Sequence, residues 1–130
     1  LNYINKNNLQ NFLKILKFKK NPYPYIKQSE IFILSSKFEG LPNVLLESQV
    51  LKKYIISSNC PTGPKEILLN GNSGDLFKIN DHNKLANLIL KFKKNKLKNH
   101  QKIKIGYNNL NRYDFIKNLE KYNKTVSQYL

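Results

Sequence analysis

Short apolar runs alternate with longer segments of helical spacing along this chain. The clearest run is Ile-Phe-Ile-Leu at residues 31–34, and a second run lies at residues 54–57. Uninterrupted apolar runs of this length are typical of strands that are buried on both faces of a parallel sheet. Pro42 suits the first turn of a helix that continues to about Lys52, so the pattern predicts a β-α-β unit.

The remaining predicted elements continue this alternation. We expect further strands at residues 12–18 and 76–79, and a turn into a short helix at residues 21–25. Asn80 or Asp81 can cap a following helix. Its apolar residues recur at helical spacing: Leu85, Leu88, Ile89 and Phe92. The sequence therefore predicts an α/β fold, in which a Rossmann-like parallel sheet is flanked by helices and followed by C-terminal helices.

The composition fits one compact domain in a reducing compartment. A chain of 130 residues with 40% hydrophobic residues can bury one core, and no apolar run approaches the roughly 20 residues that cross a bilayer. The single cysteine, Cys60, excludes an internal disulfide and has no partner thiol for zinc. We expect a cytoplasmic protein without a cofactor or metal. Because the sequence lacks methionine, we expect Leu1 to be an internal position of a longer protein.

The formal net charge of +15 raises the question of an anionic partner. Of the 23 basic residues only Arg112 is an arginine, and arginine is the side chain that nucleic-acid readers favour for phosphates and guanines. We therefore expect no specific nucleic-acid binding. Residues 91–104 carry seven lysines and no acidic residue. Two interpretations stay open for this stretch, a solvated helix face or a peripheral contact with a membrane surface.

Two glycine-bearing loops follow two of the predicted strands. The first, residues 37–43, contains Gly40, and the second, residues 60–64, contains Gly63. Because ligands bind at the carboxyl ends of strands in an open parallel sheet, both loops should border one crevice. Each loop opens onto a helix, and two helix N-termini beside one crevice suit a diphosphate. The alternative is that both loops are ordinary turns with Gly and Pro in their usual places.

Glu47 interrupts an apolar arc of the helix predicted after the first loop. At about 100° per residue, Val44 and Leu51 lie on one side of it and Val50 lies on the other. Burying an unpaired carboxylate is costly, so either the helix is exposed at this turn or Glu47 has a committed partner. That partner is either a lysine in a buried ion pair or a sugar diol. Glu39, just before the helix, would point into the same crevice.

Residues 38–47, Phe-Glu-Gly-Leu-Pro-Asn-Val-Leu-Leu-Glu, resemble the Glu-x7-Glu motif of glycosyltransferase family 4, also called the group 1 glycosyltransferases. Three flanking segments are similar to segments of that family in the same order: residues 21–25, 60–68 and 71–76. The resemblance implies that residues 1–130 are a partial C-terminal, nucleotide-sugar-binding domain of a two-domain GT-B fold. It also implies that the N-terminal acceptor domain and the first strand of the donor domain are absent from this sequence.

The resemblance further implies roles for individual residues. Glu39 would contact hydroxyls of the transferred sugar, which makes it the catalytic candidate, and Glu47 would hold the nucleotide ribose. The other candidate donor-binding residues are Gly40, Leu41, Pro42, Asn43 and Gly63. The sequence has no Asp-x-Asp. This agrees with a fold that stabilises the leaving group by helix dipoles and basic side chains, without a bound metal.

The function implied is the transfer, with retention of configuration, of a hexose or N-acetylhexosamine from a nucleotide sugar to a polysaccharide or lipid-linked acceptor. The expected nucleotide of the donor is UDP. Such an enzyme would serve cell-envelope polysaccharide synthesis in the cytoplasm or at the inner face of the cytoplasmic membrane. We expect this chain to have no catalytic activity on its own. Two alternatives stay open: an inactive remnant of such an enzyme, and a basic module that binds RNA or a membrane surface. The second would need aromatic residues interleaved with lysines, whereas the eight tyrosines are scattered.

Overall fold

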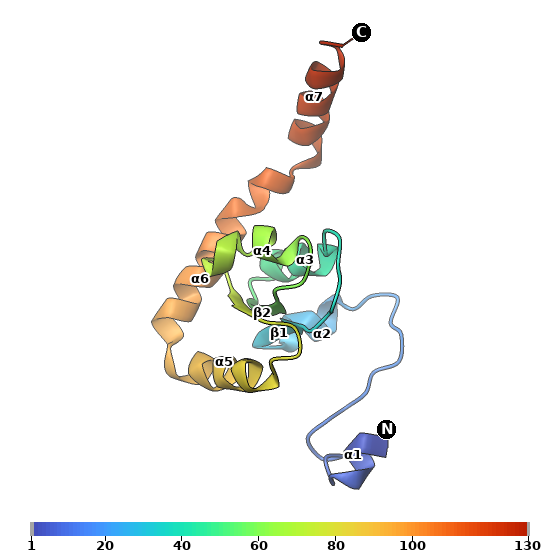
Figure 1. Ribbon diagram of the computed structural model, residues 1–130, viewed down its shortest axis with the longest axis vertical. Coiled ribbons are helices and arrows are strands. Elements are labelled where there is room, and N and C mark those ends of the chain that lie inside the picture. Colours follow the sequence, from blue (N-terminus) through green and yellow to red (C-terminus); the bar gives the residue numbers. More distant parts are fainter. Residues whose placement is uncertain (1, 130) are drawn as a thin grey trace.

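The computed structural model describes residues 2–129, which form a three-stranded parallel sheet with helices on both faces (Figure 1). The strands lie in the spatial order β1 (Ile31–Leu34), β2 (Tyr54–Ser58) and β3 (Asp75–Phe77). In the ladders Phe32 pairs with Ile55, and Ser57 pairs with Leu76. A helix joins β1 to its parallel neighbour β2, so the predicted β-α-β unit is confirmed.

Helices account for most of the remaining chain. In sequence order they are α1 (Asn2–Lys6), α2 (Tyr23–Gln28), α3 (Asn43–Val50), α4 (Pro64–Ile67), α5 (His82–Lys94), α6 (Lys96–Asn108) and α7 (Phe115–Val126), with short 3-10 turns η1 (Leu69–Gly71) and η2 (Asn109–Tyr113). Within residues 2–129, none of these helices has the length and apolar character needed to span a bilayer. Figure 1 shows α3 and α4 on one side of the sheet and α5 on the other, while α7 extends away from the body.

The core is divided by the central strand β2, whose five residues are all buried. Successive side chains of a strand point to opposite faces, so β2 contributes to two clusters. The cluster beneath α3 and α4 is formed by Leu45, Ile55, Ile67 and Leu68. The cluster beneath α5 is formed by Tyr54, Ile56, Phe77 and Leu88, with Leu85, Ile89 and Phe92 packed against it. The apolar face predicted for the helix after Asp81 is thus confirmed.

Two strand predictions need correction. Residues 12–18 form no strand; they are irregular, and Phe12 and Phe18 are 82% and 93% exposed. A strand needs a neighbour to pair its backbone groups, and no strand within residues 2–129 lies beside this segment. β1 is less buried than its apolar sequence predicts, with Ile33 38% exposed, because it is an edge strand of the described sheet.

A polar network fastens α6 to the sheet at the start of β3. The Tyr54 hydroxyl donates a 2.7 Å hydrogen bond to Asp75 Oδ2. Lys102 forms an ion pair with the same carboxylate and donates a 2.9 Å hydrogen bond to the carbonyl oxygen of Gly74. Burial alone would raise the pKa of Asp75, but the hydrogen bonds from Lys102 and Tyr54 outweigh it and lower that pKa. Burial has the largest effect in raising the pKa of Tyr54, and the Asp75 carboxylate raises this pKa further. The Tyr54 hydroxyl therefore remains a donor.

We expect Asp75→Asn to destabilise the protein at neutral pH by about 2 kcal/mol, because the largely buried Lys102 ammonium then lacks an anionic partner. The folded-state pKa of Asp75 lies below its unfolded-state value of about 3.9. Its contribution is therefore complete above about pH 5, begins to fall near the unfolded-state pKa and is lost as the pH falls through the lower, folded-state pKa. Thermal unfolding measured from neutral to acidic pH should show that the melting temperature of the variant falls less steeply with decreasing pH than that of the unmodified protein.

The control for this experiment is Glu120→Gln, since Glu120 is exposed on α7. This variant should reproduce both the neutral stability and the acid decline of the unmodified protein. An acid decline that is identical with and without the Asp75 carboxylate would contradict the role given to this network.

Candidate functional site

The two loops that the sequence singles out meet at the carboxyl edge of the sheet. We call residues 35–42 the β1 loop and residues 59–63 the β2 loop. The backbone N–H of Glu39 donates to the carbonyl oxygen of Pro61 at 3.0 Å, and the N–H of Thr62 donates back to the carbonyl oxygen of Glu39 at 2.8 Å. The loops are therefore joined by reciprocal backbone hydrogen bonds.

The close approach of the loops requires glycine at position 63. Gly63 has φ of +81°, and a Cβ added there would lie 2.1 Å from the carbonyl oxygen of Gly40 and 2.7 Å from Cδ of Pro42. Such distances are incompatible with any side chain unless the backbone moves. Gly40, in contrast, has open space where a Cβ would be. The structural need for glycine thus falls on Gly63, while Gly40 contributes its carbonyl group.

The N-terminus of α3 opens beside this contact. Pro42 occupies the N-cap position, and no side chain caps the helix. The first-turn amides of Asn43 and Val44 therefore lack intrahelical partners and can bind an anion. α4, which follows the β2 loop, has only four residues. Its dipole is accordingly weaker than that of α3, which has eight residues.

A hollow of about 520 Å³ lies along the β2 loop and α4. It is lined by residues 59–63 together with Lys65, Glu66 and Asn70. Its volume falls within the range of about 300 to 1,000 Å³ that is usual for small-molecule sites. Lys65, Glu66 and Asn70 were not among the candidate site residues predicted from the sequence. The signal available for Lys65 and Glu66 was their position at the start of the short helix that follows the β2 loop.

Glu66 also connects this hollow to the C-terminal part of the chain. Arg112 Nη2 lies 3.5 Å from Glu66 Oε1, and the Tyr113 hydroxyl lies 3.4 Å from the same atom. Both members of the ion pair are exposed, so solvent screens their attraction. Burial has the largest effect in raising the pKa of Tyr113, and the negative charge of Glu66 raises this pKa further. The only arginine of the sequence therefore contacts a residue that lines the hollow.

Glu39 is partly buried, and its backbone makes both hydrogen bonds between the loops. Within residues 2–129 its carboxylate accepts no hydrogen bond and forms no ion pair; the ion pairs there are Lys102 with Asp75 and Arg112 with Glu66. The backbone of Glu39 is thus fixed while its side-chain oxygens remain available to a ligand.

Glu47 lies on the second turn of α3 and borders a separate hollow of about 330 Å³, together with Tyr23, Val50 and Leu51. The buried face of α3 consists instead of Leu45, Ser48 and Gln49. The apolar arc around Glu47 is therefore the less buried side of the helix, where Val50 is 56% exposed. Glu47 itself is partly exposed and has no cationic partner within residues 2–129. A buried ion pair is not formed there.

Gln49 is a buried residue that the sequence did not reveal as important. Its Nε2 donates to the carbonyl oxygen of Ile67 at 3.3 Å and to Ser73 Oγ at 3.4 Å. A Cβ at Gly106 of α6 would lie 2.9 Å from the same nitrogen. Gln49 therefore fixes α3 against the end of α4 and against α6. Its only sequence signal was its spacing of four residues from Leu45.

The predicted site residues thus divide into two groups. Glu39, Gly40, Pro42 and Gly63 lie at the contact between the two loops, with Leu41 and Asn43 beside them in the chain. Glu47 borders the other hollow, next to α2. Their roles toward a donor stay predictions. Among the described residues, no three His, Cys, Asp or Glu side chains are grouped so as to hold a metal ion, and the expected absence of a metal or cofactor also stays a prediction.

A parallel sheet with helices on both faces and glycine-bearing loops at its carboxyl edge belongs to the Rossmann-like class of α/β folds. Comparison with protein families narrows this class. The family model described as glycosyl transferases group 1 matches residues 2–109. The chain belongs to this family.

Two similar proteins illustrate how much of the chain is matched by relatives in this family. An uncharacterized glycosyltransferase of Methanocaldococcus jannaschii is 49% identical over 65 residues, which is 50% of this chain and 16% of that protein. The UDP-Gal:alpha-D-GlcNAc-diphosphoundecaprenol alpha-1,3-galactosyltransferase of Escherichia coli is 31% identical over 124 residues, which is 91% of this chain and 32% of that enzyme. The chain therefore spans at most about a third of the length of these two relatives.

Among solved structures, that of Anabaena HepE in complex with UDP superimposes with a TM-score of 0.88. The sequences are 19% identical, and the match covers 98% of this chain and 35% of the other. At this identity the likeness shows the fold. The predicted fold class, a Rossmann-like sheet of the C-terminal half of a GT-B glycosyltransferase, is confirmed.

We expect Gly63→Ala to destabilise the protein by about 2 to 4 kcal/mol, since the added methyl group forces the two loops apart in addition to straining a backbone of positive φ. Gly71 offers a matched control because it also has a positive φ, +94°, but nothing lies within 4 Å of an added Cβ. Gly71→Ala should therefore show only the backbone strain of about 1 kcal/mol. Urea unfolding of both variants measures the difference, and equal losses would contradict the proposed tight contact at Gly63.

Proposed function

We propose that this chain is the donor-binding part of a retaining glycosyltransferase that transfers a hexose or N-acetylhexosamine from a UDP-sugar to a polysaccharide or lipid-linked acceptor. The name of the Escherichia coli relative specifies UDP-Gal as donor and a diphosphoundecaprenol-linked sugar as acceptor, and the HepE structure contains UDP. Both support a uridine nucleotide donor. The proposed location is the cytoplasm, at the inner face of the membrane that carries a lipid-linked acceptor.

The observation that carries this proposal is the pairing of the β1 and β2 loops beside the uncapped start of α3. The backbone hydrogen bonds of Glu39 hold the loops together, so the open amides of Asn43 and Val44 have a fixed direction. The positive end of the helix dipole stabilises a diphosphate at that position. During transfer, the bond from the anomeric carbon to the diphosphate oxygen breaks and the diphosphate keeps the electron pair, while an acceptor hydroxyl oxygen bonds to the anomeric carbon and gives up its proton. Preorganised amides stabilise this developing charge without reorganising.

Glu39 is the residue we assign to the transferred sugar. Its backbone is immobilised by Pro61 and Thr62, and its carboxylate has no partner within residues 2–129. A fixed carboxylate with free oxygens accepts strong hydrogen bonds from sugar hydroxyls. Those hydroxyls belong to the donor sugar. Loss of the Glu39 charge should therefore weaken binding of the nucleotide sugar without changing the affinity for the free nucleotide.

Glu47 is the residue we assign to the ribose. It lies four residues after Asn43, which is about 6 Å along the helix axis. A ligand with its diphosphate at the helix start thus has its next group within reach of the second helical turn. The partial exposure of Glu47 and the neighbouring hollow with Tyr23 leave room for such a group.

Two glutamine substitutions in the full-length protein test these assignments. Glu47→Gln should leave the melting temperature nearly unchanged and weaken binding of both UDP and UDP-sugar by about 1.5 to 3 kcal/mol, the value of hydrogen bonds to a charged group. Glu39→Gln should weaken UDP-sugar binding by a similar amount while leaving UDP binding unchanged. Isothermal titration calorimetry with UDP and UDP-galactose measures all four affinities.

Glu120→Gln on α7 serves as the charge-matched control and should bind both ligands normally. A Glu47→Gln variant that melts early but binds UDP normally would show a structural role for this residue. Normal binding of both ligands by both glutamine variants would contradict the proposed donor site.

A further inference from the structure

A second charged feature lies at the opposite edge of the sheet from the paired loops. We call residues 91–104, where α5 ends and α6 begins, the basic corner. It contains seven lysines and no acidic residue, and six of the lysines are exposed: Lys91, Lys93, Lys94, Lys96, Lys98 and Lys104. Lys102 is the exception because it pairs with Asp75. Glu30, which directly precedes β1, lines a hollow of this corner, so the corner lies at the amino ends of the strands.

The lysines at the start of α6 are not explained by helix stability. Lys91, Lys93 and Lys94 lie in the last turn of α5, where positive charge favours the helix. Lys96 and Lys98 lie in the first turn of α6, which has no acidic residue and no side-chain cap. Positive charge at a helix N-terminus is unfavourable. These two lysines therefore oppose the local fold, which points to an external anionic partner.

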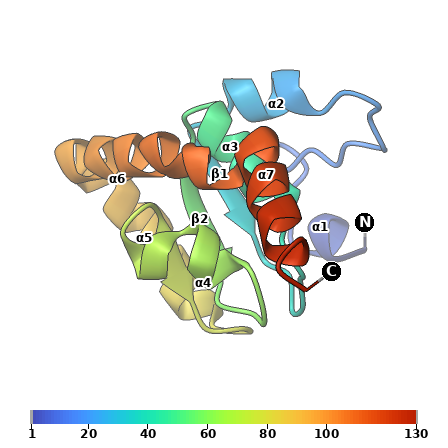
Figure 2. The same ribbon diagram turned by 90° about the horizontal axis from the view of Figure 1, so that it is seen from above.

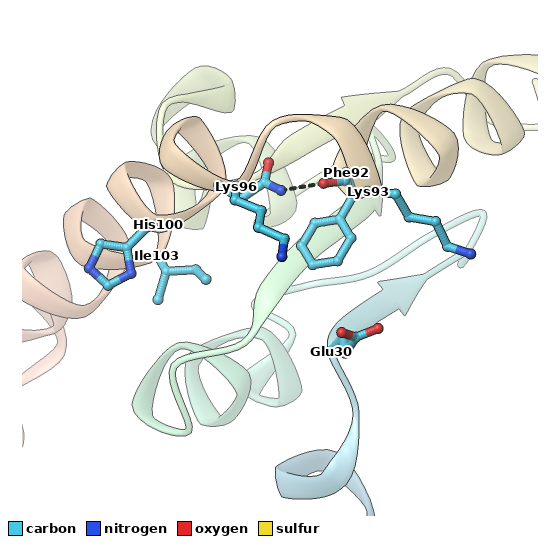
Figure 3. Close-up of a pocket in the computed structure, with 7 residues that line it drawn as sticks. Glu30, Phe92, Lys93, Lys96, His100 and Ile103 are labelled. Atoms are coloured by element: carbon cyan, nitrogen blue, oxygen red, sulfur yellow. Dashed lines mark hydrogen bonds between the residues drawn. The ribbon is translucent and has the colours of Figure 1, made fainter.

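The corner also exposes apolar surface among its lysines. Leu97, between Lys96 and Lys98, is 85% exposed. An adjacent cavity of about 480 Å³ has Phe92 and Ile103 among its lining residues. Figure 3 shows the Lys96 side chain extending toward the Phe92 ring, with Glu30 on the far side of the cavity. The corner thus combines an exposed leucine, a hollow lined in part by apolar side chains, and a group of exposed lysines.

The corner is held in a fixed shape. Asn99 is buried, and its Nδ2 donates a 2.6 Å hydrogen bond to the carbonyl oxygen of Phe92, across the junction of the two helices. The dashed line in Figure 3 marks this bond. The Asn99 backbone N–H donates at 3.0 Å to the carbonyl oxygen of Asn95, the residue between the helices. Leu97 and its lysines are therefore presented on a rigid turn.

We propose that the basic corner docks on an anionic bilayer surface, with Leu97 inserted among the headgroups and the surrounding lysines in contact with lipid phosphates. Juxtaposed lysines bind an anionic leaflet electrostatically, and an exposed apolar side chain adds hydrophobic insertion. A nucleic-acid backbone would use the lysines but would gain nothing from the exposed leucine. Docking at the amino ends of the strands leaves the paired loops at the carboxyl ends uncovered.

Vesicle binding by the full-length protein tests this surface. Lys96→Gln/Lys98→Gln should weaken partitioning onto vesicles of equal parts phosphatidylcholine and phosphatidylglycerol by about 25-fold, since each lysine near the surface contributes about fivefold. Lys78→Gln/Lys84→Gln removes the same charge from two exposed lysines elsewhere. Lys84 lies ten residues before Lys94 on α5, about 15 Å along the helix. This control should change partitioning by less than about threefold. Pure phosphatidylcholine vesicles should bind neither the unmodified protein nor the two double variants.

A second measurement follows Leu97 directly. An environment-sensitive fluorophore attached through Leu97→Cys should shift its emission to the blue when the anionic vesicles are added, whereas the same label at Lys84→Cys should not. The melting temperature of Lys96→Gln/Lys98→Gln should not fall, because both charges oppose the α6 dipole. Its affinity for UDP should also be unchanged, which separates this proposal from that for the donor site.

Three outcomes would overturn the docking surface. The first is an equal effect of the two lysine pairs, which would indicate attraction by net charge alone. The second is loss of vesicle binding in Leu119→Ser, on the exposed face of α7, with no loss in Lys96→Gln/Lys98→Gln. The third is tighter binding of an oligoribonucleotide than of anionic vesicles at physiological salt, abolished by Lys96→Gln/Lys98→Gln. That result would assign the corner to RNA.

Discussion

The reciprocal backbone hydrogen bonds between Glu39 and the β2 loop constrain the whole carboxyl edge of the sheet. They hold the carbonyl oxygen of Gly40 against position 63, where only a residue without Cβ fits. The direction in which α3 leaves the β1 loop follows from this contact, because Pro42 also packs against Gly63. The exposed amides of the helix start and the Glu39 carboxylate therefore depend on one close approach of two backbones.

Behind this edge, buried polar contacts place the helices that support the loops. Gln49 connects α3 to the end of α4 and contacts Gly106 of α6, while Asp75 receives Lys102 from another turn of α6. These contacts fix α6 at two points. Figure 2 shows the course of α6 from above, where it passes α3 and α5. A helix fixed in this way can present unfavourable lysines at its exposed start, because tertiary contacts rather than local charge determine its position.

The sequence predicted the parts of the fold that depend on local pattern. The apolar runs at residues 31–34 and 54–57 identified two neighbouring parallel strands, and Gly63 was recognised as a residue of the site loop. What the pattern could not reveal depended on tertiary neighbours. Residues 12–18 have the apolar residues of a strand but no partner strand within the described part of the chain. Gln49 resembles a surface residue in the sequence and is only 4% exposed. The apolar arc around Glu47 was identified correctly, but the sequence left open whether that turn of the helix is exposed.

Hydrogen exchange of the full-length protein, with and without UDP, tests the central claim most directly. If the paired loops and the start of α3 hold the nucleotide diphosphate, UDP should slow exchange of the Asn43 and Val44 amides, which have no intrahelical partner, and of the β2 loop. Exchange at the basic corner should not change. Slowed exchange at residues 91–104, with no change at Asn43, Val44 and residues 59–63, would contradict the account and place the nucleotide at the opposite edge of the sheet.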